Sequence, residues 1–156
     1  MPSRSLSLDY DPIPRQRLFH ASNTKYRLYG GAMGGGKSVA ICLEAIKQVT
    51  RYPGNRGYMA RHYLTDFKRT TLVTLLEFLP SGLVEKHYKH DTKITLKNGS
   101  EIVYGGLGSD EDLERIKSMS LGFFAIDEAT EASEEYFLML ASRLRWVCRN
   151  GKRPRY

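Results

Sequence analysis

The residues most able to do chemistry lie in the segment GGAMGGGKS, residues 30–38. Four residues separate Gly31 from Gly36, and Lys37 and Ser38 follow directly, which is the spacing of a phosphate-binding loop. Glycines let successive backbone N–H groups approach phosphate oxygens, and the N-terminus of a following helix adds partial positive charge. In such a loop the lysine neutralises the outer phosphates and the serine hydroxyl is offered to Mg²⁺. The predicted nucleotide-binding residues are Gly31, Gly34, Gly35, Gly36, Lys37 and Ser38.

A second candidate lies about ninety residues later, where Asp127 and Glu128 follow the apolar run Phe123–Ile126. Such a run is typical of a strand covered on both faces, and the carboxyl end of that strand lies beside the phosphate loop in an open α/β sheet. Asp127 is therefore predicted to hold the Mg²⁺ shell, and Glu128 to polarise a water molecule for attack on the γ-phosphate. An acidic pair favours hydrolysis over transfer to a small acceptor. Taken alone, the pair is equally explained as an acidic approach to the next helix.

Hydrophobic periodicity and turn residues predict the elements that position these groups. Strands are predicted at 25–29, 56–61 and 121–129, a hairpin with an Asn98–Gly99 turn at 92–106, and helices at 38–52, 64–79, 109–118 and 133–146. This alternation predicts an open α/β sheet, at least partly parallel, with one inserted hairpin. Residues 1–14 carry three prolines and are predicted to be an N-terminal arm, followed by one domain over 15–156.

Composition restricts the class of protein. The chain has 156 residues and a formal net charge of +7. This charge alone is explained equally well by a polyanionic partner, such as nucleic acid or nucleotide phosphate, and by a solvated basic surface. Cys42 and Cys148 have no metal-ligand spacing and are expected to be reduced. His87 and His90 lack an acidic or cysteine partner, so metal binding there is not expected. No secretory segment or membrane-spanning apolar run is present, so we expect an intracellular protein with no membrane partner.

The motifs together resemble a known family. The segments PIPRQRLFHAS, YRLYGGAMGGGKS, LKNGSEIVYGG, LERIKS and LGFFAIDEATEAS are similar to the large terminase subunit of tailed bacteriophages, the ATP-driven motor that packages DNA into capsids. The resemblance extends from about residue 12 to 150 and covers only the ATPase part of such a protein. It implies a P-loop NTPase fold of the ASCE type, ATP and Mg²⁺ as ligands, and location in the host cytoplasm. It also implies double-stranded DNA, the portal and the small terminase subunit as partners, and a homo-oligomeric ring.

The resemblance also implies roles for single residues. Gln16 would read the adenine edge, although a surface glutamine is the alternative. Lys37 and Glu128 would be catalytic, and Ser38 and Asp127 would hold Mg²⁺. Met33 is a departure, because similar terminases often have arginine there to stabilise charge on the γ-phosphate. A cation is then expected from elsewhere, with Arg115 acting on a neighbouring subunit as first choice, ahead of three other basic residues, Lys117, Arg143 and Arg145.

The second departure is length. The family continues beyond this point into another core strand with a polar coupling motif and then into a carboxylate-rich nuclease domain. We therefore expect a sheet that lacks one or two strands, weak turnover and no nuclease activity.

Three other functions are compatible with part of the pattern. A DEAD-like helicase fragment shares the upstream glutamine and the acidic motif but needs a second domain. A P-loop kinase needs a lid with paired arginines, which is not seen. A nucleotide- or DNA-binding module without turnover agrees with Met33 and with the short chain. A GTPase is disfavoured, because the chain has no Asn-Lys-x-Asp motif.

Overall fold

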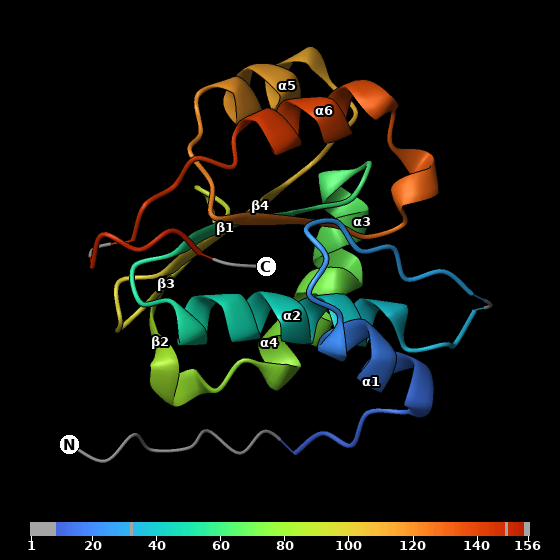
Figure 1. The fold of residues 1–156 in the computed structure, drawn as a ribbon. Helices are drawn as coiled ribbons and strands as arrows, with labels where there is room; N and C mark the ends of the chain where they lie inside the picture. Colours follow the sequence, from blue (N-terminus) through green and yellow to red (C-terminus); the bar gives the residue numbers. More distant parts are fainter. Residues whose placement is uncertain (1–8, 32, 149, 155–156) are drawn as a thin grey trace.

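The computed structural model is a sheet between two groups of helices (Figure 1). It describes residues 9–31, 33–148 and 150–154. The strands in this part of the chain are β1 (Arg56–Ala60), β2 (Val84–Tyr88), β3 (Lys93–Leu96), β4 (Glu101–Gly105) and β5 (Phe123–Ile126), and they pair in the order β2-β3-β4-β1-β5. β1 is parallel to both β4 and β5, whereas β3 is antiparallel to both of its neighbours. The predicted α/β class is confirmed, and the Asn98–Gly99 turn connects β3 to β4.

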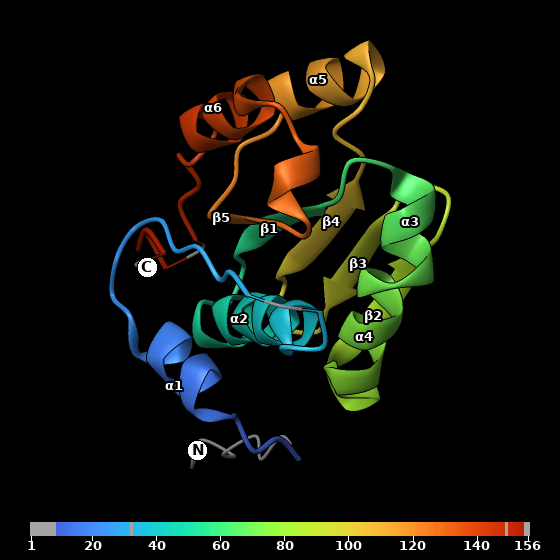
Figure 2. The same cartoon turned by 90° about the vertical axis from the view of Figure 1, so that its right-hand side faces the viewer.

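Helices cover both faces of the sheet (Figure 2). On one face lie α2 (Lys37–Arg51), α3 (Leu64–Arg69) and α4 (Thr71–Phe78), with α1 (Pro14–Ala21) packed outside α2; on the other lie α5 (Asp110–Lys117) and α6 (Glu134–Ser142). Two short 3₁₀ turns, η1 (Ser81–Leu83) and η2 (Ala129–Glu131), complete the described elements. None of the helices described is long and apolar enough to cross a bilayer.

Helix α2 is the element that carries the phosphate loop, and its sequence explains its position. Cys42, Ile46 and Val49 recur at helical spacing and are fully or almost fully buried against the sheet. The helix begins after Gly36, whose left-handed backbone (φ 68°) ends the loop, and it ends at Arg51, two residues before Pro53. The buried face of α2 therefore fixes the end of the loop against the core.

The helix predicted over residues 64–79 is wrong in one respect, because the chain breaks at Thr70 into α3 and α4. Thr70 leaves the helical region (φ −122°, ψ −75°), and its hydroxyl donates to the carbonyl of Asp66 at 2.8 Å. The next hydroxyl, that of Thr71, is buried and donates to Asp127. Threonine side chains that bond elsewhere compete with regular helix geometry, which accounts for the break.

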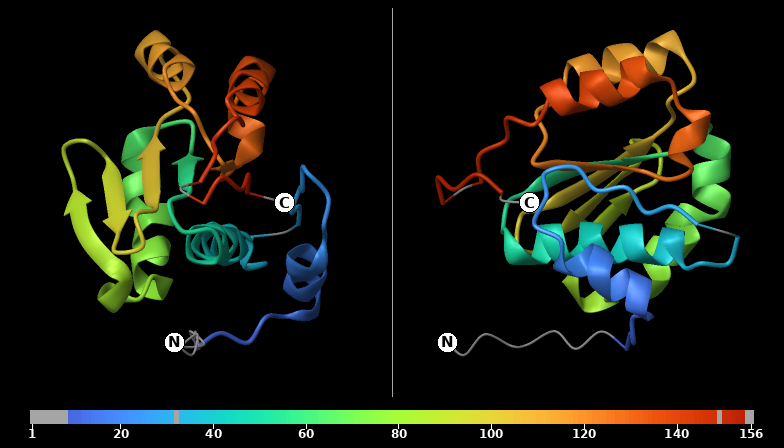
Figure 3. Two further views of the ribbon diagram at one scale, coloured as in Figure 1. Left: turned by 60° about the vertical axis from the view of Figure 1, so that its left-hand side comes forward. Right: turned by 45° about the vertical axis from the view of Figure 1, so that its right-hand side comes forward.

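The strand predicted at 25–29 does not form, and this segment is a coil that connects α1 to the loop (Figure 3). Its side chains contact helices and Phe124 of β5, but its backbone joins no strand ladder. Arg27 donates to the Phe19 carbonyl and to Glu44, and Tyr26 contacts Phe137 through a tilted ring pair. The free edge of β5 therefore pairs with no other strand in the described part of the chain.

Other boundaries also differ from expectation. Helix α1 and strand β2 have no counterpart among the predicted elements, and α6 ends at Ser142 because Leu144 turns to pair with Leu121. Of the predicted N-terminal arm, residues 1–8 lie outside the described residues. Cys42 and Cys148 are free and buried in the described chain.

Candidate functional site

Three flanking groups hold the glycine-rich loop in place. Gln16 Nε2 donates to the carbonyl of Gly36 at 3.0 Å, and Tyr29 Oη donates to that of Gly35 at 3.0 Å. The Lys37 ammonium group turns back across the loop and donates to the carbonyl of Gly31 at 2.9 Å. The loop is therefore tied to α1, to the preceding coil and to its own lysine.

Asp127 lies at the carboxyl end of β5 and is almost completely buried. Its backbone N–H donates to Ala60 at 2.8 Å and so continues the β1–β5 ladder. Its Oδ2 accepts hydrogen bonds from Ser38 Oγ at 3.0 Å and from Thr71 Oγ1 at 2.6 Å, and its Oδ1 accepts one from the Glu128 N–H at 3.1 Å. The loop serine and the acidic motif, 89 residues apart in sequence, are thus in direct contact.

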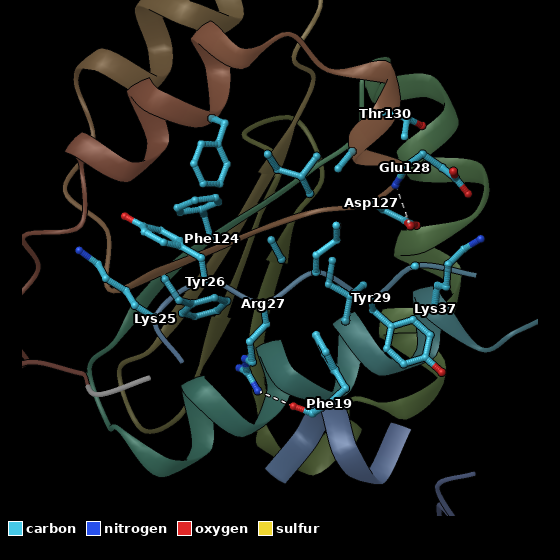
Figure 4. A pocket seen from close by; sticks show the side chains of 18 of the residues that line it. Phe19, Lys25, Tyr26, Arg27, Tyr29, Lys37, Phe124, Asp127, Glu128 and Thr130 are labelled. Carbon is cyan, nitrogen blue, oxygen red and sulfur yellow. Dashed lines mark hydrogen bonds between the residues drawn. The ribbon is translucent and has the colours of Figure 1, made fainter. Parts of the chain in front are cut away.

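Glu128 has an unusual backbone for a residue other than glycine, with φ 51° and ψ 55° in the left-handed region. Such a conformation costs free energy and is found where the surrounding structure imposes it, often at functional sites. It turns the chain directly after β5. Figure 4 shows Glu128, Asp127 and Lys37 at the same end of one pocket.

This pocket has a volume of about 710 Å³ and lies between β5 and the coil that precedes the loop. Its other end is aromatic, with Tyr26 and Phe124 near Lys25 (Figure 4). A polar, charged end next to an apolar wall is the usual composition of a ligand site.

The surroundings of the Asp127 carboxylate suit a Mg²⁺ ion. Two hydroxyls and one backbone N–H donate to this buried carboxylate, and none of them carries a formal positive charge that would cancel its own. No group of three or more acidic, histidine or cysteine side chains gathers as a metal site in the described residues. Mg²⁺ typically takes one or two protein oxygens and completes its shell with phosphates and water. Ser38 and Asp127 fit that pattern.

Gln16 is buried rather than on the surface, with 4% of the residue exposed. Its Oε1 accepts from the Ile13 N–H at 3.0 Å while its Nε2 donates to the loop. An amide has two N–H donors and two acceptor lone pairs, so one of each remains for a ligand edge. Its predicted contact with adenine stays a prediction.

The candidate arginine finger is engaged within its own chain. Arg115 lies on α5, on the opposite face of the sheet from α2 (Figure 1), and donates to the carbonyls of Tyr104 and Asp91 and to Thr92 Oγ1. Met33 is 97% exposed and offers no charge. The role of Arg115 on a neighbouring subunit stays a prediction.

The other basic candidates are also engaged. Lys117 forms an ion pair with Glu114, Arg143 donates to the Lys117 carbonyl, and Arg145 donates to Ser120 Oγ.

Sequence reasoning missed two residues at this site, Thr71 and Arg61. Arg61 directly follows β1, and its guanidinium binds the Glu131 carboxylate at 3.2 Å. The hydrogen bond from Arg61 to Glu131 raises the pKa of Arg61, and the nearby Asp127 carboxylate acts in the same direction. Arg61 could have been found by the rule that side chains after parallel strands meet at one edge. Thr71 had no such signal, because it lies inside a predicted helix.

A phosphate loop that opens a helix and faces an acid at the end of a parallel strand defines a P-loop NTPase. Within that class, the chain belongs to the phage terminase large-subunit family, because the sequence model described as "Phage terminase large subunit" matches residues 23–154. No curated protein matches the chain in sequence.

Solved structures agree in fold. The chain is similar to the large terminase ATPase domain of Thermus phage P74-26, with a TM-score of 0.71, 20% identity and coverage of 89% of this chain and 64% of that one. It is also similar to the large terminase of a thermophilic bacteriophage, with a TM-score of 0.66, 17% identity and coverage of 74% of this chain and 30% of that one. The same thermophilic-phage terminase in complex with ADP aligns with a TM-score of 0.64, 18% identity and the same coverage. The chain thus spans less than a third of that terminase.

Proposed function

We propose that this chain binds and hydrolyses ATP as the ATPase part of a phage DNA-packaging motor. The observation that carries the proposal is the 3.0 Å hydrogen bond between Ser38, which follows the loop lysine, and Asp127, at the end of β5. Family membership supports the choice of nucleotide, as do the solved complexes of the thermophilic-phage terminase with ADP and with ATP-gamma-S.

The geometry supports the following sequence of events. The triphosphate enters the glycine loop, and the Lys37 ammonium exchanges the Gly31 carbonyl for phosphate oxygens. Ser38 and Asp127 would hold Mg²⁺, which neutralises phosphate charge when bound. Glu128 then accepts a proton from water while the water oxygen bonds to the γ-phosphorus and the bond to the ADP oxygen breaks. The left-handed turn at Glu128 keeps this base adjacent to, but separate from, Asp127.

The remaining parts of the proposal rest mainly on the family. They are coupling of hydrolysis to translocation of double-stranded DNA, assembly into a homo-oligomeric ring, contact with the portal and the small subunit, and action in the host cytoplasm. Gln16 is proposed to read adenine and Arg115 to act on the nucleotide of a neighbour. The net charge of +7 suits a DNA partner.

The first test is phosphate release from ATP by the wild-type chain and by Glu128→Gln, with and without double-stranded DNA. Because the amide cannot accept the proton, turnover is expected to fall by about 10²–10⁴-fold, with binding of a fluorescent ATP analogue retained. Glu134→Gln, an exposed acid in the first turn of α6, is the matched control and should change neither quantity.

The outcomes separate the alternatives. Hydrolysis stimulated by DNA supports the motor, strand separation would favour a helicase fragment, and phosphorylation of a small molecule would favour a kinase. Nucleotide binding by the wild-type chain without any turnover would favour a non-catalytic module, for which Met33 is the supporting residue.

A further inference from the structure

The hydroxyl of Thr71 makes a contact that the neighbouring threonines do not make. Thr70, between α3 and α4, donates its hydroxyl to the carbonyl of Asp66, and Thr74 Oγ1 donates to that of Thr70, so each finds an acceptor four residues earlier. Thr71 Oγ1 instead donates to Asp127 Oδ2 at 2.6 Å, across 56 residues of sequence. Thr71 is the first residue of α4, so no carbonyl three or four residues earlier lies within its own helix, and its buried hydroxyl uses Asp127 as acceptor instead.

The position of Thr71 is set by the packing around it. The residue is fully buried, and the Cys42 thiol of α2 donates to its carbonyl at 3.6 Å. Burial raises the pKa of Cys42, and the Asp127 carboxylate adds to the effect, so this thiol stays neutral and the charge near it remains that of Asp127. The helix break at Thr70 places the first turn of α4 here, and the N-terminal end of a helix favours a neighbouring carboxylate.

The contact fixes the Asp127 carboxylate without neutralising it. Its Oδ2 accepts two hydroxyl hydrogens, from Ser38 and Thr71, and its Oδ1 accepts the Glu128 N–H. A lysine or arginine at position 71 would cancel the charge that attracts a cation, and an aliphatic residue would leave Oδ2 with one donor fewer. A serine hydroxyl can bind Mg²⁺ through its oxygen and still donate its hydrogen, so Ser38 and Thr71 would together hold the rotation of the carboxylate.

We propose that Thr71 is a positioning residue that orients Asp127 for Mg²⁺, so that α4 is part of the metal–nucleotide site. This inference rests on the function proposed above, because it assumes that Asp127 serves a Mg²⁺–nucleotide complex. Partners that orient a metal ligand typically change metal affinity by about 10–100-fold when removed.

The test compares Thr71→Val, which keeps the shape but removes the hydroxyl, with Thr71→Ser, which keeps the hydroxyl. Binding of a non-hydrolysable ATP analogue is titrated in Mg²⁺ and in EDTA, and the Mg²⁺ midpoint is measured at fixed nucleotide. Thr71→Val is expected to weaken binding in Mg²⁺ and to raise the Mg²⁺ midpoint by about ten-fold, with binding in EDTA unchanged. Thr71→Ser should keep the wild-type nucleotide affinity in Mg²⁺ and the wild-type Mg²⁺ midpoint. Thr74→Val, the same change one turn along α4, should also leave both unchanged.

Circular dichroism and a thermal melt accompany each variant, and Thr71→Ala replaces Thr71→Val if the valine protein does not fold. Equal losses in Mg²⁺ and in EDTA would show a purely structural role and overturn the inference. A Mg²⁺ midpoint for Thr71→Val equal to that of Thr74→Val would also overturn the inference. In either case, Mg²⁺-dependent nucleotide binding by the wild-type chain would leave the proposed function intact. Absence of such binding by the wild-type chain would contradict both proposals.

Discussion

At the scale of the residue, Gly36 meets two separate requirements. Its backbone is left-handed (φ 68°), a conformation that residues with a Cβ atom adopt at a cost. A Cβ built on it would lie 2.3 Å from Gln16 Nε2, which uses the open space to reach the Gly36 carbonyl. The same glycine therefore ends the loop and admits the side chain proposed to read the base.

We predict that Gly36→Ala distorts the loop and displaces Gln16. The left-handed backbone alone costs about 1–2 kcal/mol in an L-residue, and about 1.4 kcal/mol corresponds to a ten-fold change in affinity. Titration with a fluorescent ATP analogue should therefore show at least about ten-fold weaker binding. Gly30→Ala is the control, because nothing lies within 4 Å of a Cβ there. Equal affinity of the two variants would contradict the prediction.

At the scale of the elements, one buried carboxylate joins α1 and the coil before the loop to α2. Glu44 on α2 accepts hydrogen bonds from His20 Nδ1 at 2.5 Å and from Arg27 Nη2 at 2.7 Å, and Lys47 is also within ion-pair distance. Burial by itself would raise the pKa of Glu44, but the hydrogen bonds from Arg27 and His20 lower it below its ordinary value. The element that carries Gln16 is thereby held against the helix that carries Lys37.

We predict that Glu44→Gln lowers the free energy of unfolding by about 2 kcal/mol, the size of a hydrogen bond to a charged group. Urea denaturation measures the change, and Glu77→Gln, an exposed acid on α4, should show almost none. Because the folded-state pKa of Glu44 is below its unfolded value, its contribution is complete above the unfolded pKa and is lost as the pH falls through the folded pKa. The difference between wild type and Glu44→Gln should thus shrink on acidification. A difference that grows towards low pH would be inconsistent with this assignment.

At the scale of the whole molecule, the glycine-rich loop and the proposed finger lie on different faces of the sheet. Arg115 is tied to the chain around β3 and β4 through the Thr92 hydroxyl at 2.7 Å and two carbonyls, whereas Lys37 begins α2 on the other face. A guanidinium in this position would act on a neighbouring subunit in a ring rather than on its own loop. Such an action requires it to exchange at least one of these acceptors for phosphate oxygen.

We predict complementation between two inactive variants, Arg115→Ala and Lys37→Ala, when they are mixed under conditions that assemble the ring. The first keeps an intact loop and the second keeps the arginine, so mixed interfaces contain both. Phosphate release should be restored in the mixture and absent from each variant alone. If Arg115 only stabilises its own chain, mixing will not restore phosphate release. Hydrolysis by Arg115→Ala alone at the wild-type rate would also contradict the prediction.

The sequence by itself determined the class and the two halves of the site. The loop from Gly31 to Ser38 is contiguous, and Asp127 directly follows an apolar strand, so local spacing and the rule for parallel sheets were enough to predict where each lies. The alternation of helices and strands and the Asn98–Gly99 turn were readable for the same reason, since neighbouring residues encode them.

Only the tertiary structure decided what depends on contacts between distant residues. The aromatic segment 25–29 has the alternation of a strand, but Glu44 and Phe137 hold it as a coil, and no pattern within five residues encodes those partners. Likewise Thr71 has the pattern of an ordinary helical residue, and its role follows only from Asp127 lying beside it. Secondary structure is read from neighbours in sequence, whereas a hydrogen bond across 56 residues exists only after the chain has packed.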